Sequence, residues 1–244
     1  MEVPMSYQKL AATRGTNAEG AVPANTVILF AIGGYEYSLR PNPWPFLTSQ
    51  SAAEEMAEKV AQWPKLYGCD GIDLDIEAGA GSSTTAGVNM VHFVKRIRQI
   101  SPDMIINQPV YGFPQVAAET YVVNHSWDTE TNFLGVANGV GLMVYQGTES
   151  LRYVSNYSNG TDKYDGFPIK VRVPKGSILL GCMGGATSSD IKTLASEAVK
   201  QDLAGMMVWY SSVINGFQYS TYWDAVGHQD SIDGYLEATK ILNP

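Results

Sequence analysis

The chain has 244 residues, of which 45% are hydrophobic, a size and composition that can bury the core of one large domain. Its 24 acidic and 16 basic side chains give a formal net charge of −8. Because phosphate neutralisation needs a basic surface, we expect no nucleic-acid partner. No apolar run approaches the roughly 20 residues that span a bilayer, so we also expect a soluble protein without a membrane partner.

The N-terminal residues, Met1 to Met5, lack the basic and apolar regions of a secretory signal. Two interpretations stay open: a cytoplasmic protein, and a secreted protein whose leader is absent from this chain. Residues 1–25 are polar and contain glycine. We expect them to form an irregular segment with at most one short strand near residues 3–7.

Apolar segments rich in β-branched residues alternate with segments of helical periodicity along the chain. In chain order, we predict a strand at 26–34, a helix at 50–63, a strand at 68–77, a helix at 85–100, a strand at 103–111, a helix at 115–123, a strand at 139–146, a loop or short helix at 149–157, a strand at 177–184, a helix at 189–201, a strand at 203–210 and a helix at 232–242. Ser188 or Ser189 is expected to cap the helix that begins there.

Six βα repeats of this kind predict a parallel sheet with helices outside it. A doubly wound sheet and a β/α barrel fit the alternation equally well. Two glycine pairs, Gly33–Gly34 and Gly184–Gly185, lack the spacing of nucleotide-binding loops, and we interpret them as tight strand ends. No linker or internal repeat divides the chain, so we predict a single domain over residues 1–244.

Acidic and aliphatic residues alternate from Asp70 to Glu77. Side chains two residues apart share one face of a strand, so Asp73, Asp75 and Glu77 point one way and the aliphatic side chains point the other. Three carboxylates in one stripe repel each other and resist burial; folding gives no reason to build this stripe, whereas catalysis does. A hard-cation site for Mg²⁺ or Ca²⁺ is the rival interpretation. Asp70 lies off the stripe and is expected to make structural hydrogen bonds.

These eight residues fit D-x-x-D-x-D-x-E and resemble the active-site strand of glycoside hydrolase family 18, the chitinase family. Further motifs follow in the family's order. Ala31–Gly34 resembles its S-x-G-G strand end with alanine in place of serine, and Met143–Gln146 resembles its M-x-Y-D strand end with glutamine in place of aspartate. Trp209 resembles the tryptophan on the last strand of the family's barrel. The resemblance runs from about residue 26 to the C-terminus.

The resemblance implies an α/β fold of the (β/α)8 TIM-barrel type, with active residues at the carboxyl ends of the strands. The chain reaches the family's third strand near residue 26, whereas one βαβ unit takes roughly 30 residues or more. We therefore expect a barrel shortened at its N-terminus, with about six recognisable βα units. An incomplete barrel exposes strand edges, so we hypothesise either a gap or a homo-oligomer that pairs through those edges.

The resemblance also implies a chitinase-like glycosidase that cleaves β-1,4-linked N-acetylglucosamine polymers with retention, by a substrate-assisted mechanism. Glu77 would protonate the leaving oxygen and later activate water, while the substrate's own 2-acetamido carbonyl attacks C1. Asp75 would hold the acetamido N–H, and Asp73 would share a proton with Asp75, so that the acids titrate as a coupled set. Tyr145 would hydrogen-bond the acetamido group. We expect neither a metal nor a cofactor.

A further set of residues is predicted to bind substrate, with ordinary packing as the alternative for each. Trp209 is expected to form the apolar floor under the sugar, because aromatic faces stack on sugar C–H faces. The other candidates are Gly34, Tyr35, Tyr111, Met143 and Gln146.

Two alternative functions remain open. An endo-β-N-acetylglucosaminidase acting on N-glycans would use the same acid and the same acetamido chemistry with different loops. A weakly active or non-catalytic chitin-binding, lectin-like protein is the other alternative. Such proteins usually lose the acid, whereas Glu77 is present in this chain.

Overall fold

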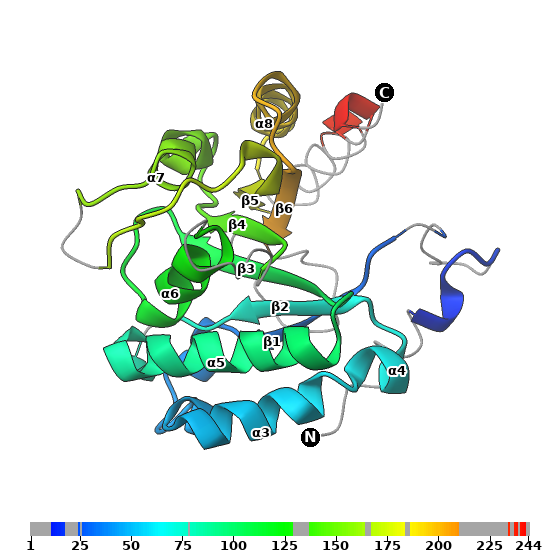
Figure 1. Cartoon of the computed structure of the whole chain (residues 1–244). Coiled ribbons are helices and arrows are strands. Elements are labelled where there is room, and N and C mark those ends of the chain that lie inside the picture. Colours follow the sequence, from blue (N-terminus) through cyan, green and yellow to red (C-terminus); the bar gives the residue numbers. More distant parts are fainter. Residues whose placement is uncertain are drawn as a thin grey trace. The chain divides into compact units, whose positions relative to one another are not determined.

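Six strands alternate with helices along the chain, in the order that the sequence predicts (Figure 1). The computed structural model of the protein describes residues 11–17, 24, 26–77, 79–128, 137–163, 167–183, 186–209, 234, 237–238 and 240–242. The strands are β1 (Leu29–Gly33), β2 (Gly71–Asp75), β3 (Ile105–Tyr111), β4 (Gly139–Met143), β5 (Ile178–Met183) and β6 (Gly205–Trp209). They form one parallel sheet in chain order, which confirms the predicted α/β class with six βα units.

The helices fill the connections between these strands. The α-helices are α2 (Tyr35–Ser38), α3 (Gln50–Val60), α4 (Trp63–Tyr67), α5 (Thr84–Ile100), α6 (Ala117–Ser126), α7 (Val154–Ser158) and α8 (Ser188–Lys200). The 3-10 helices are η1 (Pro45–Leu47), η2 (Gly79–Ser82), η3 (Glu149–Tyr153) and η4 (Lys175–Ser177). Within the described residues, no helix combines the length and the apolar character needed to cross a membrane.

Some helix boundaries differ from the prediction for local reasons. The helix predicted over 50–63 ends at Val60, and α4 begins at Trp63 with Pro64 in its first turn, where a missing N–H breaks no helical hydrogen bond. The short helix α2 was not predicted. The hydroxyl oxygen of Thr187 accepts the Asp190 N–H at 3.1 Å and caps α8, so the prediction of a serine cap is wrong.

The two ends of the chain are described in part. Residues 11–13 form a helical turn, and the strand suggested near residues 3–7 lies outside the described residues. The helix predicted over 232–242 is confirmed at residues 234, 237–238 and 240–242.

Residue contacts divide the chain into two compact units. The first contains Met1–Gln108 and Val116–Asn138, and therefore β1, β2 and the beginning of β3. The second contains Pro109–Gln115 and Gly139–Pro244, and therefore the end of β3 and all of β4, β5 and β6. The single domain over residues 1–244 stays a prediction.

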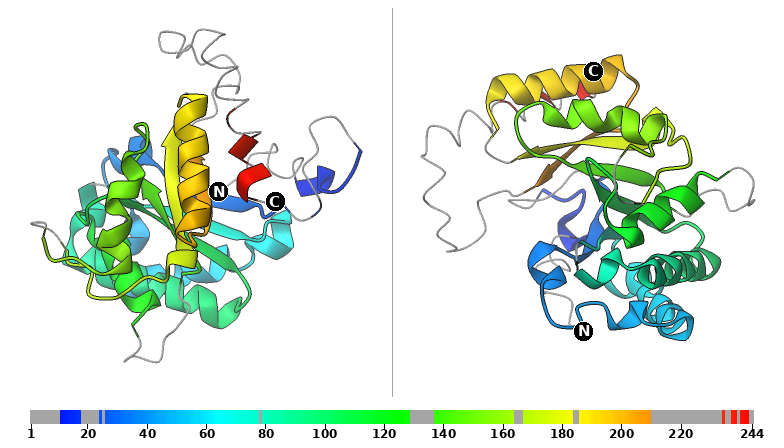
Figure 2. Two further views of the ribbon diagram at one scale, coloured as in Figure 1. Left: turned by 90° about the horizontal axis from the view of Figure 1, so that it is seen from above. Right: turned by 90° about the vertical axis from the view of Figure 1, so that its left-hand side faces the viewer.

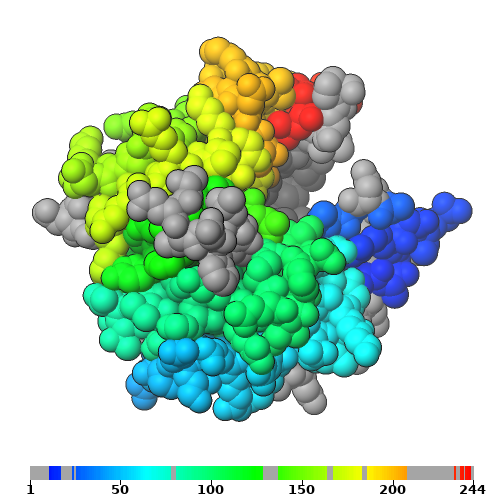
Figure 3. All heavy atoms as spheres, viewed as in Figure 1, coloured from blue at the N-terminus to red at the C-terminus, as the bar shows by residue number. Residues whose placement is uncertain are grey.

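Aliphatic side chains of strands and helices form the core of the first unit. Those of Ile72, Leu74 and Ile76 on β2 and directly after it are fully buried, as the alternation of the sequence predicts. Helices α3 and α5 lie alongside β1 and β2 (Figure 1), and their outer surfaces make one continuous face (Figure 3). Their buried residues include Ala53, Ala57, Val60, Phe93, Val94 and Ile97. The acidic strand is therefore backed by close-packed apolar side chains that hold it in place.

The second unit has a core of the same kind. Helix α8 lies along β5 and β6, and Figure 2 shows it lengthwise. The core residues of these elements and of β4 are Val140, Leu142, Ile178, Leu180, Ile191 and Leu194, all fully buried.

Candidate active site

The acidic stripe lies at the carboxyl end of β2. Asp73 and Asp75 belong to the strand, whereas Glu77 follows its end by two residues, so the strand predicted over 68–77 is shorter than expected. The alternation nevertheless continues to Glu77, which is only 8% exposed. Burial of an ionisable group costs free energy, and here the group lies on the side of the strand opposite the apolar core. This costly burial distinguishes a candidate active site from a solvent-exposed acidic surface.

The turn after β1 fastens this end of β2. Gly33 lies opposite Asp75 in the parallel register, and the Gly34 N–H donates a 2.8 Å hydrogen bond to the Asp75 carbonyl oxygen. Both glycines have positive φ, 120° and 101°. A Cβ on Gly33 would lie 1.9 Å from that carbonyl oxygen, so only glycine allows the two backbones to approach this closely. This confirms that Gly33–Gly34 forms a tight strand end, whereas Gly184–Gly185 lies outside the described residues.

A side chain from β3 holds Asp73. Asn107 lies opposite Asp73 in the register of β2 and β3, and its Nδ2 donates a 2.6 Å hydrogen bond to Asp73 Oδ1. Burial raises the pKa of Asp73 to about 6, and the Asn107 hydrogen bond opposes that rise.

The carboxyl group of Asp75, unlike that of Asp73, accepts no hydrogen bond from a described side chain. Its Oδ1 is buried and makes no hydrogen bond with the described residues. Burial, together with the negative charges of Glu77 and Asp73, raises the pKa of Asp75 to about 7. An acceptor of this kind is ready for a donor from a bound ligand, because an unpaired buried oxygen is costly.

Glu77 is placed by the segment that leads into α2 and by α2 itself. The Ser38 hydroxyl donates to the Gly34 carbonyl oxygen at 3.0 Å and accepts the Glu77 N–H at 3.2 Å. One buried serine thus connects the β1 turn to the backbone of Glu77. The backbone position of the predicted acid is consequently set by two segments of the chain.

Asp70 makes structural hydrogen bonds, as the sequence predicts. Its carboxylate accepts two hydrogen bonds from Arg14, at 2.8 and 3.1 Å, and one of 2.8 Å from the Ile28 N–H. Burial would raise the pKa of Asp70, but these hydrogen bonds and the Arg14 charge outweigh it and hold the pKa below its usual value. The pair ties residues 11–17 to the amino end of β2, away from the acidic stripe.

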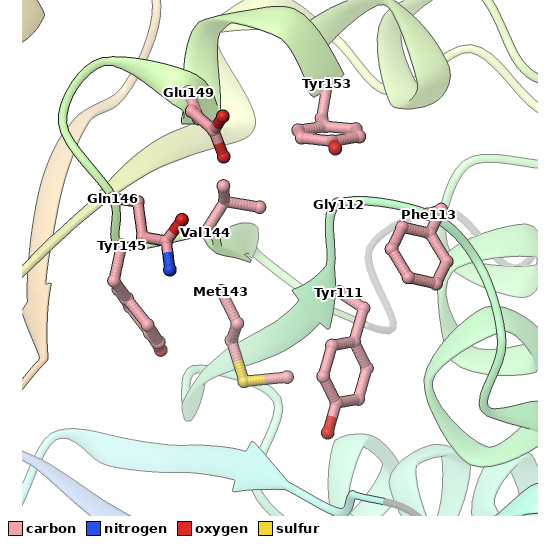
Figure 4. Close-up of a pocket in the computed structure, with 9 residues that line it drawn as sticks. All are labelled: Tyr111, Gly112, Phe113, Met143, Val144, Tyr145, Gln146, Glu149 and Tyr153. Atoms are coloured by element: carbon pink, nitrogen blue, oxygen red, sulfur yellow. The ribbon is translucent and has the colours of Figure 1, made fainter.

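The second unit contains a pocket of about 300 Å³ at the ends of β3 and β4 (Figure 4). The side chains of Tyr111, Met143 and Tyr145 extend to one side of it, with Glu149 and Tyr153 on the other. Gly112, Phe113, Val144 and Gln146 complete the lining. An aromatic lining with a few polar groups is typical of pockets that bind small molecules, sugars among them.

Helix α7 fixes the wall of this pocket that β3 provides. Asn156 Nδ2 donates to the Gly112 carbonyl oxygen at 2.8 Å, and the Tyr157 hydroxyl donates to the Tyr111 carbonyl oxygen at 2.5 Å. A Cβ on Gly112 would lie 2.7 Å from the Tyr153 ring and from Val144. The backbone of this wall is therefore held on both sides, by hydrogen bonds and by packing.

The predicted site residues fall into both units. In the first unit, Gly34 lies beside the acidic stripe, while Tyr35 is 53% exposed at the start of α2. Four candidates line the pocket of the second unit: Tyr111, Met143, Tyr145 and Gln146. Trp209 is the last residue of β6, opposite Met183 in the register of β5, and its side chain lies outside the described part of the chain.

Metal ligation was the rival interpretation of the acidic stripe. No group of three or more His, Cys, Asp or Glu side chains in the described ranges is arranged to hold a metal ion. The carboxyl groups of Asp73 and Asp75 are partly buried and have raised pKa values, so they can exchange protons near neutral pH.

Several residues of these two regions were not predicted. Ser38 and Asn107 lie in the first unit, and Glu149 and Tyr153 lie in the second. The adjacent amides Asn107 and Gln108 inside the predicted strand at 103–111 were a signal for Asn107, because a buried amide needs a partner. Ser38 carried no signal in the sequence, since its role depends on the turn after β1.

Comparison with known proteins links these features to one fold. No protein-family model and no curated protein matches the chain. A GH18 chitinase from Pseudoalteromonas aurantia matches with a TM-score of 0.57 and 16% sequence identity, over 87% of this chain and 76% of that one. The chitinase-like agglutinin from Robinia pseudoacacia matches with a TM-score of 0.55 and 13% identity, over 87% and 82%.

A third solved structure is that of YKL-39 in the presence of chitooligosaccharides. It matches with a TM-score of 0.59 and 11% identity, over 98% of this chain and 85% of that one. The chain therefore has the fold of the chitinases and chitinase-like proteins of glycoside hydrolase family 18, which confirms at the level of the fold what the sequence motifs predicted.

Proposed function

We propose that this chain, which has the fold of glycoside hydrolase family 18, cleaves β-1,4-linked N-acetylglucosamine oligosaccharides with retention at the anomeric carbon. The observation that carries the proposal is the stripe of Asp73, Asp75 and Glu77 at the carboxyl end of β2, in which the two aspartates are partly buried and Glu77 is buried. Active residues of barrel enzymes lie at this end of the strands. The fold alone would support a binding protein equally well, so the proposal rests on these three side chains.

The first chemical step uses Glu77 and the substrate. The Glu77 carboxyl gives its proton to the glycosidic oxygen as the bond from C1 to that oxygen breaks. The carbonyl oxygen of the substrate's 2-acetamido group forms a bond to C1 from the opposite face, which gives a cyclic oxazolinium ion. In the second step, the Glu77 carboxylate takes a proton from water as the water oxygen attacks C1 and opens the oxazolinium ring. Two inversions at C1 give net retention.

Asp75 serves the acetamido group in both steps. Its buried Oδ1, which has no hydrogen bond within the described residues, is the acceptor for the acetamido N–H. The negative charge that develops on Asp75 as its proton passes to Asp73 stabilises the positive oxazolinium ion, and the effect is strong in a site that is largely shielded from water. This fits a substrate that carries an amide at C2.

The residues of the second unit enter the proposal through the resemblance. Tyr145 donates its hydroxyl to the acetamido carbonyl oxygen, and Trp209 supplies the sugar platform. Met143, Gln146 and Tyr111 contribute binding surface, and their shared pocket supports a binding role for this set. Gly34 and Tyr35 are proposed as substrate contacts next to the acidic stripe.

Binding without turnover is the second candidate function. The chain resembles a chitinase-like agglutinin about as closely as it resembles a chitinase, with TM-scores of 0.55 and 0.57. Glu77 favours the enzyme, and an endo-β-N-acetylglucosaminidase acting on N-glycans would use the same acid. Activity on chitotetraose and on a glycoprotein with N-linked glycans separates the two enzymes.

The deciding experiment measures release of the fluorophore from a 4-methylumbelliferyl chitobioside. We expect turnover by the wild-type protein and a loss of roughly 1,000-fold or more in Glu77→Gln, since the acid and base are removed together. The matched control is Glu58→Gln, which removes an exposed carboxylate of α3 that pairs with Arg96 at 2.6 Å and should leave the rate unchanged. Equal rates in wild type and Glu77→Gln would refute the assignment of Glu77 as the acid and base. Binding of chitotetraose without turnover in the wild type would establish the second candidate function, a binding protein without activity.

A further inference from the structure

The acidic stripe contains an asymmetry between its two aspartates. Asp73 accepts a 2.6 Å hydrogen bond from Asn107, whereas Asp75 Oδ1 is buried and has no donor within the described residues. Two partly buried carboxyl groups on the same face of one strand, two residues apart, disfavour double ionisation. They hold one proton between them over a range of pH, and the surrounding donors decide which of the two carries it.

The strand on the other side of β2 offers neither carboxyl group a side-chain donor. Ala31 lies opposite Asp73 in the register of β1 and β2, and Gly33 lies opposite Asp75. The motif resemblance has a serine at the position of Ala31, so this chain lacks a hydroxyl there. Asn107 is the one side-chain donor to Asp73 among the described residues.

We propose that Asn107 is a positioning residue of the acidic site: its amide keeps Asp73 as the ionised hydrogen-bond acceptor and so leaves the proton of the pair on Asp75. This inference rests on the proposed function for its catalytic consequence, but not for its electrostatic content. Asp75 then presents a neutral carboxyl group to an arriving acetamido group and gains charge only as its proton passes to Asp73 during the reaction.

The environment of the pair supports this order of ionisation. The charged or titratable groups that act on Asp75 are Glu77 and Asp73, and none from β1 or β3 acts on either aspartate within the described residues. Burial raises the pKa of both aspartates, and the Asn107 amide, which donates to Asp73 alone, opposes that rise at Asp73 and not at Asp75.

Two substitutions isolate the amide. Asn107→Leu removes the donor while it keeps the number and branching of the side chain's heavy atoms, and Asn107→Asp replaces it with a group that cannot donate when ionised. The matched control is Gln108→Leu in the next position of β3, whose side-chain amide donates to the Leu74 carbonyl oxygen at 3.0 Å. The control also removes a buried amide between β2 and β3, at the position of β3 that alternates to the face opposite Asn107.

The test is a carbon-detected NMR titration of the aspartate carboxyl groups in the intact protein, without substrate. We expect the titration midpoint of Asp73 to rise by about one pH unit or more in Asn107→Leu, above that of Asp75, and further in Asn107→Asp. In Gln108→Leu the order of the two midpoints should match the wild type. An unchanged order in Asn107→Leu, or the same reversal in Gln108→Leu, would overturn the proposal.

Kinetics then test the catalytic consequence separately. If the chain hydrolyses the fluorogenic chitobioside, the acidic limb of its pH–kcat profile should move up by about one pH unit in Asn107→Leu and not in Gln108→Leu. A wild type without turnover would refute the proposed function while the NMR result still decides the role of Asn107. If the NMR titration order reverses in Asn107→Leu but the acidic limb of the pH–kcat profile does not move, Asn107 sets the pKa values of the two aspartates without affecting turnover. That result would overturn its proposed part in catalysis.

Discussion

The backbones of Gly34 and Asp75 are joined by a 2.8 Å hydrogen bond, so the turn after β1 and the end of the acidic strand form one rigid corner. Gly33 makes this corner tight, because an added Cβ would lie 1.9 Å from the Asp75 carbonyl oxygen. We predict that Gly33→Ala lowers the free energy of unfolding by more than about 3 kcal/mol, through steric overlap with a backbone that cannot move away. Urea denaturation followed by tryptophan fluorescence measures the effect.

Gly34→Ala is the matched control for that substitution. Gly34 also has positive φ, but its added Cβ would meet only Asp75 Oδ2, at 3.8 Å. Its cost is that of backbone strain alone, about 1–2 kcal/mol. Equal losses in the two variants would mean that strain, and not the close approach to Asp75, dominates at this corner.

The raised pKa of Asp75 makes folding stability depend on pH. In the unfolded chain this group titrates at its ordinary value of 3.8, and in the folded protein at about 7. The folded state therefore favours the protonated form, and the stability it contributes is complete below pH 3.8 and is lost as the pH rises through 7. We predict that this group lowers the free energy of unfolding by about 2–3 kcal/mol between pH 5 and pH 8.

Asp75→Asn removes this titration while it keeps the shape of the side chain. We expect thermal unfolding of the variant to vary less with pH than that of the wild type, with the largest gain in stability at pH 8. The coupled partner Asp73, with a pKa raised to about 6, retains a smaller dependence. A variant whose stability falls as steeply as the wild type's between pH 5 and 8 would contradict the assignment.

The sequence predicts those parts of the fold and site that depend on periodicity within one segment. The buried side chains of Ile72, Leu74 and Ile76 and the opposite face of Asp73 and Asp75 follow from the two-residue period of a strand. The structural role of Asp70 follows from the same period, because its position places it off the acidic stripe. The order of strands follows from repeated βα alternation.

Contacts between segments could not be predicted from the sequence alone. The pairing of Asn107 with Asp73 depends on the register of β3 against β2, and a shift by one residue would turn Asn107 to the other face. The Ser38 hydrogen bonds depend on a short helix that has too few residues to show a period. The Thr187 cap was missed because three neighbouring hydroxyl residues, 187 to 189, compete for one position, and the start of the helix decides among them.

The Arg14–Asp70 ion pair is predicted to hold the N-terminal segment against β2. Its side chains are 22% and 31% exposed, so solvent screens the pair in part. We expect Arg14→Met to lower the free energy of unfolding by about 0.5–1 kcal/mol at pH 7. Because the pKa of Asp70 is lowered in the folded protein, this contribution is present above the unfolded value of 3.8 and is lost as the pH falls through the folded value.

Amide hydrogen exchange measures the local effect of that substitution. Protection of residues 11–17 should fall in Arg14→Met, while protection of β2 is retained. The control is Lys59→Met, which breaks an exposed pair with Glu55 inside α3 and should not change exchange in the N-terminal segment. Full protection of residues 11–17 in Arg14→Met would show that other contacts hold the segment.

The pocket of the second unit allows a test with two tyrosines of the same lining. Tyr145 and Tyr153 both contribute to the pocket, on opposite sides of it (Figure 4), but only Tyr145 is proposed to hydrogen-bond the acetamido carbonyl oxygen. Because that oxygen becomes the nucleophile, a hydrogen bond to it orients the attack. We predict that Tyr145→Phe lowers kcat for the fluorogenic chitobioside by roughly 100-fold with little change in KM.

Tyr153→Phe removes a hydroxyl of the same kind and should change kcat less than about threefold, because its ring packs on Gly112 and keeps that contact. Equal losses in both variants would place the effect in the general integrity of the pocket, and a loss confined to KM in Tyr145→Phe would make its hydroxyl a ground-state binding group.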